Sequence, residues 1–170
     1  MNIFIKISSS MILLFAVSCS SQTQQNHQVI KPVLADNTVV ENNGLIATSS
    51  PYSVAETSTR LENIIKQKGL TLFTRIDHSA NAADVELELN PTQVLIFGNP
   101  KVGTPLMQCS ATTAIDLPQK ILVYQDKNNQ TQVVYNDPNY LQQRHNIKGC
   151  EPILEKVSGV LNSVVMEAIK

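Results

Sequence analysis

The segment LIFGNPKVGTPLM, residues 95–107, joins an apolar run to a glycine-containing turn. The run Val94–Phe97 is continuous and apolar, which is typical of a strand in the centre of a sheet. Gly98 and Gly103 flank four residues and Thr104 follows, so the turn approaches the phosphate-binding pattern G-x-x-x-x-G-K-[ST]. Two interpretations are open: a nucleotide-binding loop, and a plain turn between a strand and a helix.

The turn lacks the groups that bind phosphate. Thr104 stands where the lysine that reaches the outer phosphates is required, and Lys101 lies inside the loop. Pro100 also removes one backbone N–H from those that would surround a phosphate. We therefore favour a strand-to-helix turn, with Thr104 as the N-cap and Pro105 at the first position of a short helix that runs to about Thr113. An anion held by backbone N–H groups at this helix N-terminus is the weaker alternative.

An amphipathic helix and a strand are predicted before this segment. Ser53 and Glu56 form an S-x-x-E capping box, apolar residues follow at helical spacing, and Gly69 supplies the stop. Over Leu70–Ile76, one set of alternate residues is mostly apolar and the other is mostly polar, which predicts a strand with one buried face. The first set is Leu70, Leu72, Thr74 and Ile76, and the second is Thr71, Phe73 and Arg75. The other elements expected here are a short strand at Leu45–Thr48 and a short helix over His78–Leu87.

A hairpin and a long helix are predicted after it. Lys120–Gln125 and Thr131–Asn136 are β-rich runs separated by the turn residues DKNNQ. Asn139–His145 is expected to be helical, and the broad apolar stripe over Ile153–Ala168 predicts the longest helix. Because strands and helices do not alternate strictly, we predict the α+β class, with an antiparallel sheet covered on one face by two long helices.

The first residues resemble an export signal. Lys6 precedes the apolar run Met11–Val17, which is too short to span a bilayer and has the length of a signal-peptide core. The run ends in Ala-Val-Ser-Cys, residues 16–19, which resembles a bacterial lipobox with small residues before an obligatory cysteine. This resemblance implies cleavage after Ser18 and acylation of Cys19. An ordinary cleaved signal, or a buried cysteine, is the alternative.

Three parts of the chain follow from this interpretation. Residues 1–18 are predicted to be a lipoprotein signal peptide, residues 19–43 a flexible polar tether, and residues 44–170 a single α+β domain. The acylated Cys19 would bind the lipid bilayer and hold the domain in the bacterial cell envelope, facing the periplasm or the exterior. Ser20 after this cysteine is compatible with sorting to an outer membrane where one exists.

The charge composition argues against a nucleic-acid partner. The 170 residues contain 13 Lys and Arg against 14 Asp and Glu, for a net charge of −1, with no basic run. Nucleic-acid binding needs clustered Lys and Arg to neutralise phosphates, so we expect no nucleic-acid partner.

Four blocks of sequence carry a resemblance to a known family. In order they are FTRIDHSANA from Phe73, LIFGNPKVGTPLM from Leu95, AIDLPQKILVY from Ala114 and VVYNDPNYLQQRH from Val133. They resemble the bacterial and archaeal domain-of-unknown-function family 302, over about residues 44–169. The resemblance implies a β-α-β4-α order with a curved antiparallel sheet, like the TATA-binding-protein group, and a homodimer. It implies no reaction, and the chain departs from the usual pattern at Gln119 and in its cysteine pair.

The two cysteines outside the lipobox, Cys109 and Cys150, are predicted to pair. An exported protein sits in an oxidising space, which favours a disulfide over two buried free thiols. A redox-active pair is disfavoured because no C-x-x-C spacing is present to lower a thiol pKa.

Polar residues at the expected strand ends suggest a ligand site, because functional residues gather on loops that a scaffold positions. The candidate residues are Asp77, His78, Gly98, Asn99, Gly103, Thr104, Asp116, Asn136, Asp137 and Tyr140. Each also has a structural interpretation. Asp77 and Asp137 could cap helices, and Asp116 could form an Asx turn.

These observations favour a membrane-anchored module that binds a small ligand or an envelope protein, without catalysis. The alternative is an enzyme in which His78 is the base and Asp116 orients it. A third interpretation is a homodimer whose sheets join. His27, His78 and His145 lack the spacing of metal ligands, and we expect neither a metal nor another cofactor. The sequence pattern does not identify a Ser-His-Asp catalytic triad.

Overall fold

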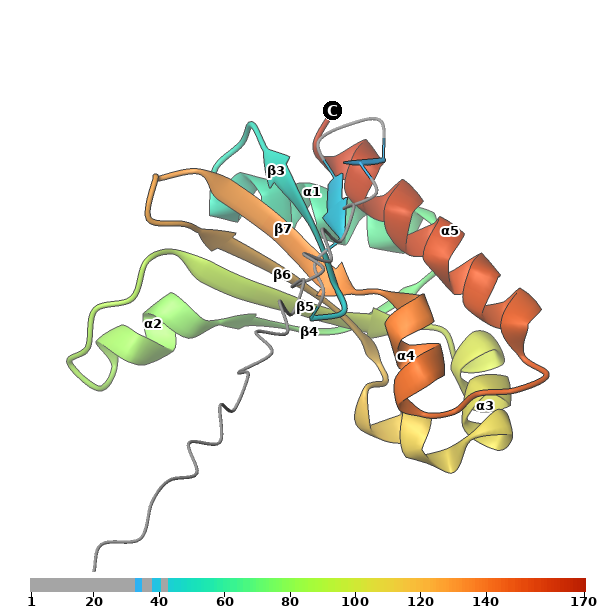
Figure 1. Ribbon diagram of the computed structural model, residues 1–170. Helices are drawn as coiled ribbons and strands as arrows, with labels where there is room; N and C mark the ends of the chain where they lie inside the picture. The colour runs from blue at the N-terminus through green and yellow to red at the C-terminus, as the bar shows by residue number, and fades with distance from the viewer. Residues whose placement is uncertain (1–32, 35–37, 41–42) are drawn as a thin grey trace, which may run out of the picture. The chain divides into compact units, whose positions relative to one another are not determined.

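A computed structural model describes residues 33–34, 38–40 and 43–170 of the chain (Figure 1). Contacts divide the chain into two units, residues 1–30 and 31–170, and the described elements all belong to the second unit. The strands are β1 (Val33–Leu34), β2 (Thr38–Val40), β3 (Leu45–Ser50), β4 (Thr71–Asp77), β5 (Thr92–Gly98), β6 (Gln119–Gln125) and β7 (Thr131–Asn136). The helices are α1 (Val54–Gln67), α2 (His78–Ala83), α3 (Pro100–Cys109), the 3₁₀ helix η1 (Ala111–Ile115), α4 (Pro138–Arg144) and α5 (Glu151–Ala168).

The strands form one antiparallel sheet in the order β1-β2-β3-β7-β6-β5-β4. In the centre of the sheet, Leu95 of β5 pairs with Ile121 of β6, and Ile121 pairs with Tyr135 of β7. From β3 onward, with the short helices set aside, the element order is β-α-β4-α. The α+β class predicted from the sequence is therefore confirmed.

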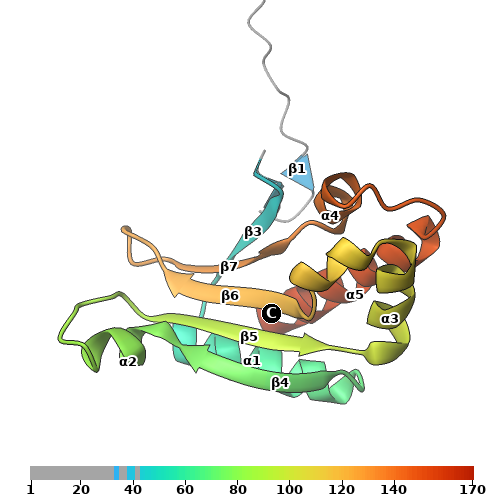
Figure 2. The ribbon, with the colours of Figure 1, turned by 90° about the horizontal axis from the view of Figure 1, so that it is seen from below.

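The two long helices, α1 and α5, pack on the same face of the sheet (Figure 1). Leu61 of α1 and Val164 of α5 are fully buried in one hydrophobic core with side chains from the strands. Leu95 of β5 and Val123 of β6 are also fully buried in this core. Burial of each such side chain contributes roughly 1.5–3 kcal/mol to the hydrophobic term of folding. In Figure 2, which is seen from below, β4 and β5 lie in front of α1.

Several predicted boundaries agree with the structure. Ser53 caps α1, and its side-chain oxygen accepts a hydrogen bond from the Glu56 backbone N–H at 3.2 Å. Gly69 follows the helix with a φ of +69°, in the left-handed region that favours glycine. The predicted hairpin is formed by β6 and β7. The helix predicted over His78–Leu87 is shorter, since α2 ends at Ala83.

The start of α3 differs from the prediction. The N-cap is Asn99 rather than Thr104, and its side chain accepts from the Lys101 backbone N–H at 2.9 Å. The physical reason is that Asn99-Pro100 offers the same combination of a capping side chain and a proline at the first helical position, five residues earlier. Pro105 consequently lies inside α3, and the residues after Ser110 form the separate helix η1.

The sheet also begins earlier than the predicted domain boundary at residue 44. Within the predicted tether, β2 pairs with β3 through Val39 opposite Ala47 and Val40 opposite Ile46. Without this pairing, β3 would leave a row of backbone N–H and C=O groups unpaired at the sheet edge. Cys19, the predicted signal peptide and the rest of the tether lie outside the described residues. Among the described helices, none combines the length and the apolar character needed to cross a bilayer.

Candidate functional site

The predicted site residues lie at two opposite ends of the sheet. Asp77 pairs with Gln93 on β5, whereas Gln119 pairs with Phe97 on β5, near the end that carries the other candidates. Gln93 and Phe97 are four residues apart along β5, which is about 13 Å at the rise of a strand. Asp77 and His78 therefore lie apart from the other eight candidates, of which four line one pocket.

The enzyme alternative that paired His78 with Asp116 is contradicted by this topology. His78 is exposed at the start of α2, at the far end of β4, while Asp116 lies between η1 and β6. A base and the carboxylate that orients it must lie within hydrogen-bond reach, and residues at opposite ends of a sheet cannot meet that condition.

Asp77 caps α2, as its structural interpretation predicted. Its carboxylate accepts hydrogen bonds from the Ser79 hydroxyl at 2.6 Å, the Ala80 backbone N–H at 3.0 Å and the Gln93 side-chain amide at 2.8 Å. These bonds stabilise the ionised form, the Ser79 bond most, and they lower the pKa of Asp77 to about 2.

Asp137 and Tyr140 join α4 to the start of β3. The Asp137 carboxylate caps α4 by accepting from the Asn139 backbone N–H at 2.9 Å, and its own N–H donates to the Gly44 carbonyl at 2.9 Å. The Tyr140 ring lies so close to Gly44 that a Cβ there would come within 2.2 Å of the ring. Asn136 pairs with Leu45 in the sheet. These contacts give all three candidates structural roles.

Asp116 binds a histidine that the sequence did not point to. The imidazole of His145, which is buried, contacts the Asp116 carboxylate through Nε2 at 2.5 Å and the Thr112 hydroxyl through Nδ1 at 3.0 Å. Arg144 lies 3.4 Å from the other carboxylate oxygen. Because 29 residues separate Asp116 from His145, no local spacing could have predicted the pair. The contact ties α4 to the segment that follows η1.

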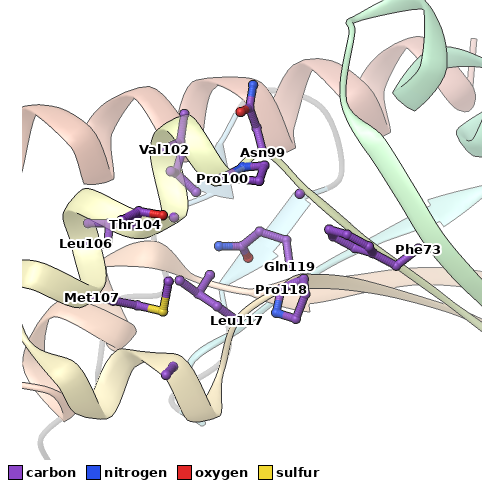
Figure 3. A pocket seen from close by; sticks show the side chains of 14 residues that line it. Phe73, Asn99, Pro100, Val102, Thr104, Leu106, Met107, Leu117, Pro118 and Gln119 are labelled. Atoms are coloured by element: carbon purple, nitrogen blue, oxygen red, sulfur yellow. The ribbon is translucent and has the colours of Figure 1, made fainter.

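The remaining candidates, Gly98, Asn99, Gly103 and Thr104, line one pocket of about 250 Å³ between α3 and the end of the sheet (Figure 3). Its walls are mostly apolar. They include Phe73 of β4, Val102, Leu106 and Met107 of α3, Leu117, and Val157 of α5. The polar side chains in the wall are Asn99, Thr104 and Gln119.

A disulfide holds the α3 wall of this pocket in place. As predicted, Cys109 at the end of α3 and Cys150 just before α5 have their sulfur atoms at bonding distance, with Cα atoms 6.5 Å apart. The bond closes a loop over a sequence separation of 41 residues. Such a cross-link stabilises a fold by roughly 2–4 kcal/mol, mainly by restricting the unfolded chain.

The backbone at the start of α3 offers no site for an anion. The Lys101 N–H donates to the Asn99 side chain, and the Val102 and Gly103 N–H groups both donate to the Asn99 carbonyl at 2.9 Å. Pro100 has no N–H to give. The weaker alternative of an anion at this helix N-terminus is therefore contradicted, because its donors are already used.

The pocket has room for a small molecule, but its described wall contains no ionisable side chain that could transfer a proton. No group of three or more His, Cys, Asp or Glu side chains within the described part of the chain could hold a metal ion. The arrangement suits the enclosure of a small molecule rather than acid–base chemistry.

Comparisons with known proteins agree on the family. Residues 46–164 match the model described as Domain of unknown function DUF302. The crystal structure of an uncharacterized conserved DUF302 protein from Bacillus stearothermophilus superposes with a TM-score of 0.67 at 21% identity, covering 74% of this chain and 98% of that chain. This likeness supports the fold alone.

Curated relatives come from Brucella. Proteins named fluoride-specific ion channel FluC 1, from Brucella suis biovar 1 and Brucella abortus biovar 1, are 42% identical over 106 residues, 62% of this chain. The match spans 42% and 39% of those relatives, so the chain covers about two-fifths of their length. Because the family model covers most of the chain and the fold agrees with a solved member, the chain belongs to the DUF302 family.

Proposed function

We propose that this chain is a lipoprotein of the bacterial cell envelope whose DUF302 domain binds a small ligand in the pocket between α3 and the sheet. The observation that carries the proposal is the pocket itself, about 250 Å³ with a largely apolar wall. Clefts that bind drug-sized molecules measure roughly 300–1,000 Å³, so a somewhat smaller ligand is expected.

The anchor rests on the sequence. The short apolar run and the lipobox-like residues 16–19 support acylation of Cys19. A disulfide-bonded domain is consistent with export, since disulfides persist in oxidising compartments. The bilayer is then the lipid partner of the chain, and the domain faces the envelope space.

Native mass spectrometry of the full chain, purified from its own cell envelope, tests ligand binding. Thr104 lines the pocket and is exposed, so Thr104→Phe should fill it, whereas Gln108→Phe changes an exposed α3 residue outside the pocket. We expect extra mass beyond the lipid on the wild-type chain and on Gln108→Phe, and none on Thr104→Phe. A wild-type chain without extra mass, or extra mass that survives Thr104→Phe, would contradict the proposal.

Protein binding is a second candidate. In the Brucella relatives, a stretch similar to this chain forms about two-fifths of proteins named as ion channels, which favours a domain that works beside another protein. The sheet face turned away from α1 and α5 is the surface for such a partner or for a second copy of the chain (Figure 2). Light scattering on the full chain in detergent distinguishes a homodimer from a monomer, and a monomer alone would exclude the joined-sheet dimer.

A further inference from the structure

The pocket wall selects against charged ligands. Among the described residues, its side chains are apolar, amide or hydroxyl groups, with none that could pair with an ionic ligand. The backbone N–H groups at the start of α3 are also taken by Asn99. A charged ligand would therefore lose its hydration without gaining a partner, which is costly in apolar surroundings. The occupant expected from this wall is neutral.

Gln119 supplies an unpaired amide inside this apolar wall. It begins β6, and Figure 3 shows its side chain reaching toward Thr104 and Leu106 of α3. Within the part of the chain that the structure describes, neither the oxygen nor the nitrogen of this amide has a hydrogen-bond partner. An amide covered by a ligand without partners costs free energy, so a fitting ligand must satisfy it.

The hydrogen-bonding capacity of Gln119 specifies the ligand's polar group. A glutamine amide offers one acceptor oxygen and two N–H donors in one plane. A carboxamide or a lactam presents the complementary donor and acceptor side by side and can form both bonds at once. A carboxylate could accept from the amide nitrogen but would face the amide oxygen with a second acceptor. The amide therefore favours a neutral ligand that both donates and accepts.

We propose that the pocket binds a small neutral molecule with an apolar, ring-sized body and one carboxamide-type group, which Gln119 recognises. This inference rests on the proposed function of the pocket. The apolar body contacts Phe73, Met107 and Leu117, and the polar group pairs with the Gln119 amide. Gln119 is thus the specificity-determining residue of the site.

A matched set of probes tests the proposal. Benzamide, benzoate and toluene share one ring and differ in the group attached to it. The full chain, in lipid nanodiscs and labelled with ¹³C at its methionine methyl groups, is titrated with each probe, and empty nanodiscs serve as the blank for partitioning into lipid. Met107 lines the pocket and reports binding there, while Met166 on α5 lies outside the lining residues and serves as the internal control.

We expect benzamide to shift the Met107 signal and to bind about tenfold more tightly than benzoate or toluene, as two hydrogen bonds of ordinary strength would give. Gln119→Leu should remove this preference while toluene still binds. Gln108→Leu, an exposed α3 residue outside the pocket, should leave it unchanged.

The outcomes separate this inference from the proposed function. Equal binding of benzamide and toluene to the wild-type chain, or a benzamide preference that survives Gln119→Leu, would overturn the role of Gln119 and leave the pocket as a binding site. A Met107 signal that none of the three probes shifts would overturn both the ligand class and the pocket's function.

Discussion

At the scale of single residues, Asp77 illustrates how a polar side chain at a strand end can resemble a site and serve the fold. Its carboxylate binds Ser79, Ala80 and Gln93, which together begin α2 and hold it beside β5. Both carboxylate oxygens accept hydrogen bonds from the protein's own groups. A capping role therefore accounts for its position.

Asp77→Ala tests this role. Loss of an N-cap side chain costs about 1 kcal/mol of stability. Since the folded pKa of Asp77 lies below its ordinary value of 3.8, at about 2, its contribution is present above pH 3.8 and lost as the pH falls toward 2. Urea unfolding at several pH values should show a gap between wild type and variant that closes in this acidic window. A gap that stays constant would contradict the assignment.

His145 and Asp116 form the other residue-scale contact that matters to the fold. We expect His145→Ala to lower the free energy of unfolding by about 1–3 kcal/mol, because a partly buried carboxylate loses its closest partner. Urea unfolding measures this loss. His78→Ala is the matched control, since His78 is exposed and its removal should change stability by less than about 0.5 kcal/mol. Equal effects of the two substitutions would show that the buried contact contributes little.

At the scale of elements, α3 determines the pocket, and its two ends are fixed by different means. Asn99 begins the helix, and the Cys109–Cys150 bond ties its last residue to the start of α5. Pro105 lies in its interior, where the missing N–H weakens the helical hydrogen bonding. The disulfide thus stabilises an element whose own backbone bonding is incomplete.

Removal of the bond should lower stability and loosen the pocket wall. The double variant Cys109→Ser, Cys150→Ser is expected to lose about 2–4 kcal/mol of unfolding free energy. Hydrogen exchange should rise in α3 more than in α1, which the bond does not touch. Urea unfolding with and without reductant supplies the control, because reductant should destabilise the wild type and leave the double variant unchanged. A double variant as stable as the oxidised wild type would contradict this account.

The elements were predicted best where local signals were unambiguous. The capping box at Ser53 and the hairpin residues act over a few positions, and the structure confirms both. The error at α3 arose because two capping candidates, Asn99 and Thr104, each precede a proline. Local propensity could not rank them, and in the structure the N-cap is Asn99.

At the scale of the whole chain, the proposed lipid anchor determines where the domain acts. Cys19→Ser should abolish labelling with a fatty-acid analogue and move the protein from the membrane pellet to the supernatant after ultracentrifugation. The double variant of Cys109 and Cys150 is the matched control and should keep its label. A wild-type chain that retains its first residues and carries no fatty acid would overturn the anchor.

The sequence by itself determined the α+β class and predicted the pairing of the two cysteines, and it offered capping as one of two interpretations of Asp77 and Asp137. Each rests on residue type, periodicity or spacing, which are properties of short stretches or of composition. Only the tertiary structure decided that His78 and Asp116 lie apart, that His145 binds Asp116, and that Gln119 enters the pocket. Those relations depend on strand order and register, which bring distant residues together and which no local pattern encodes.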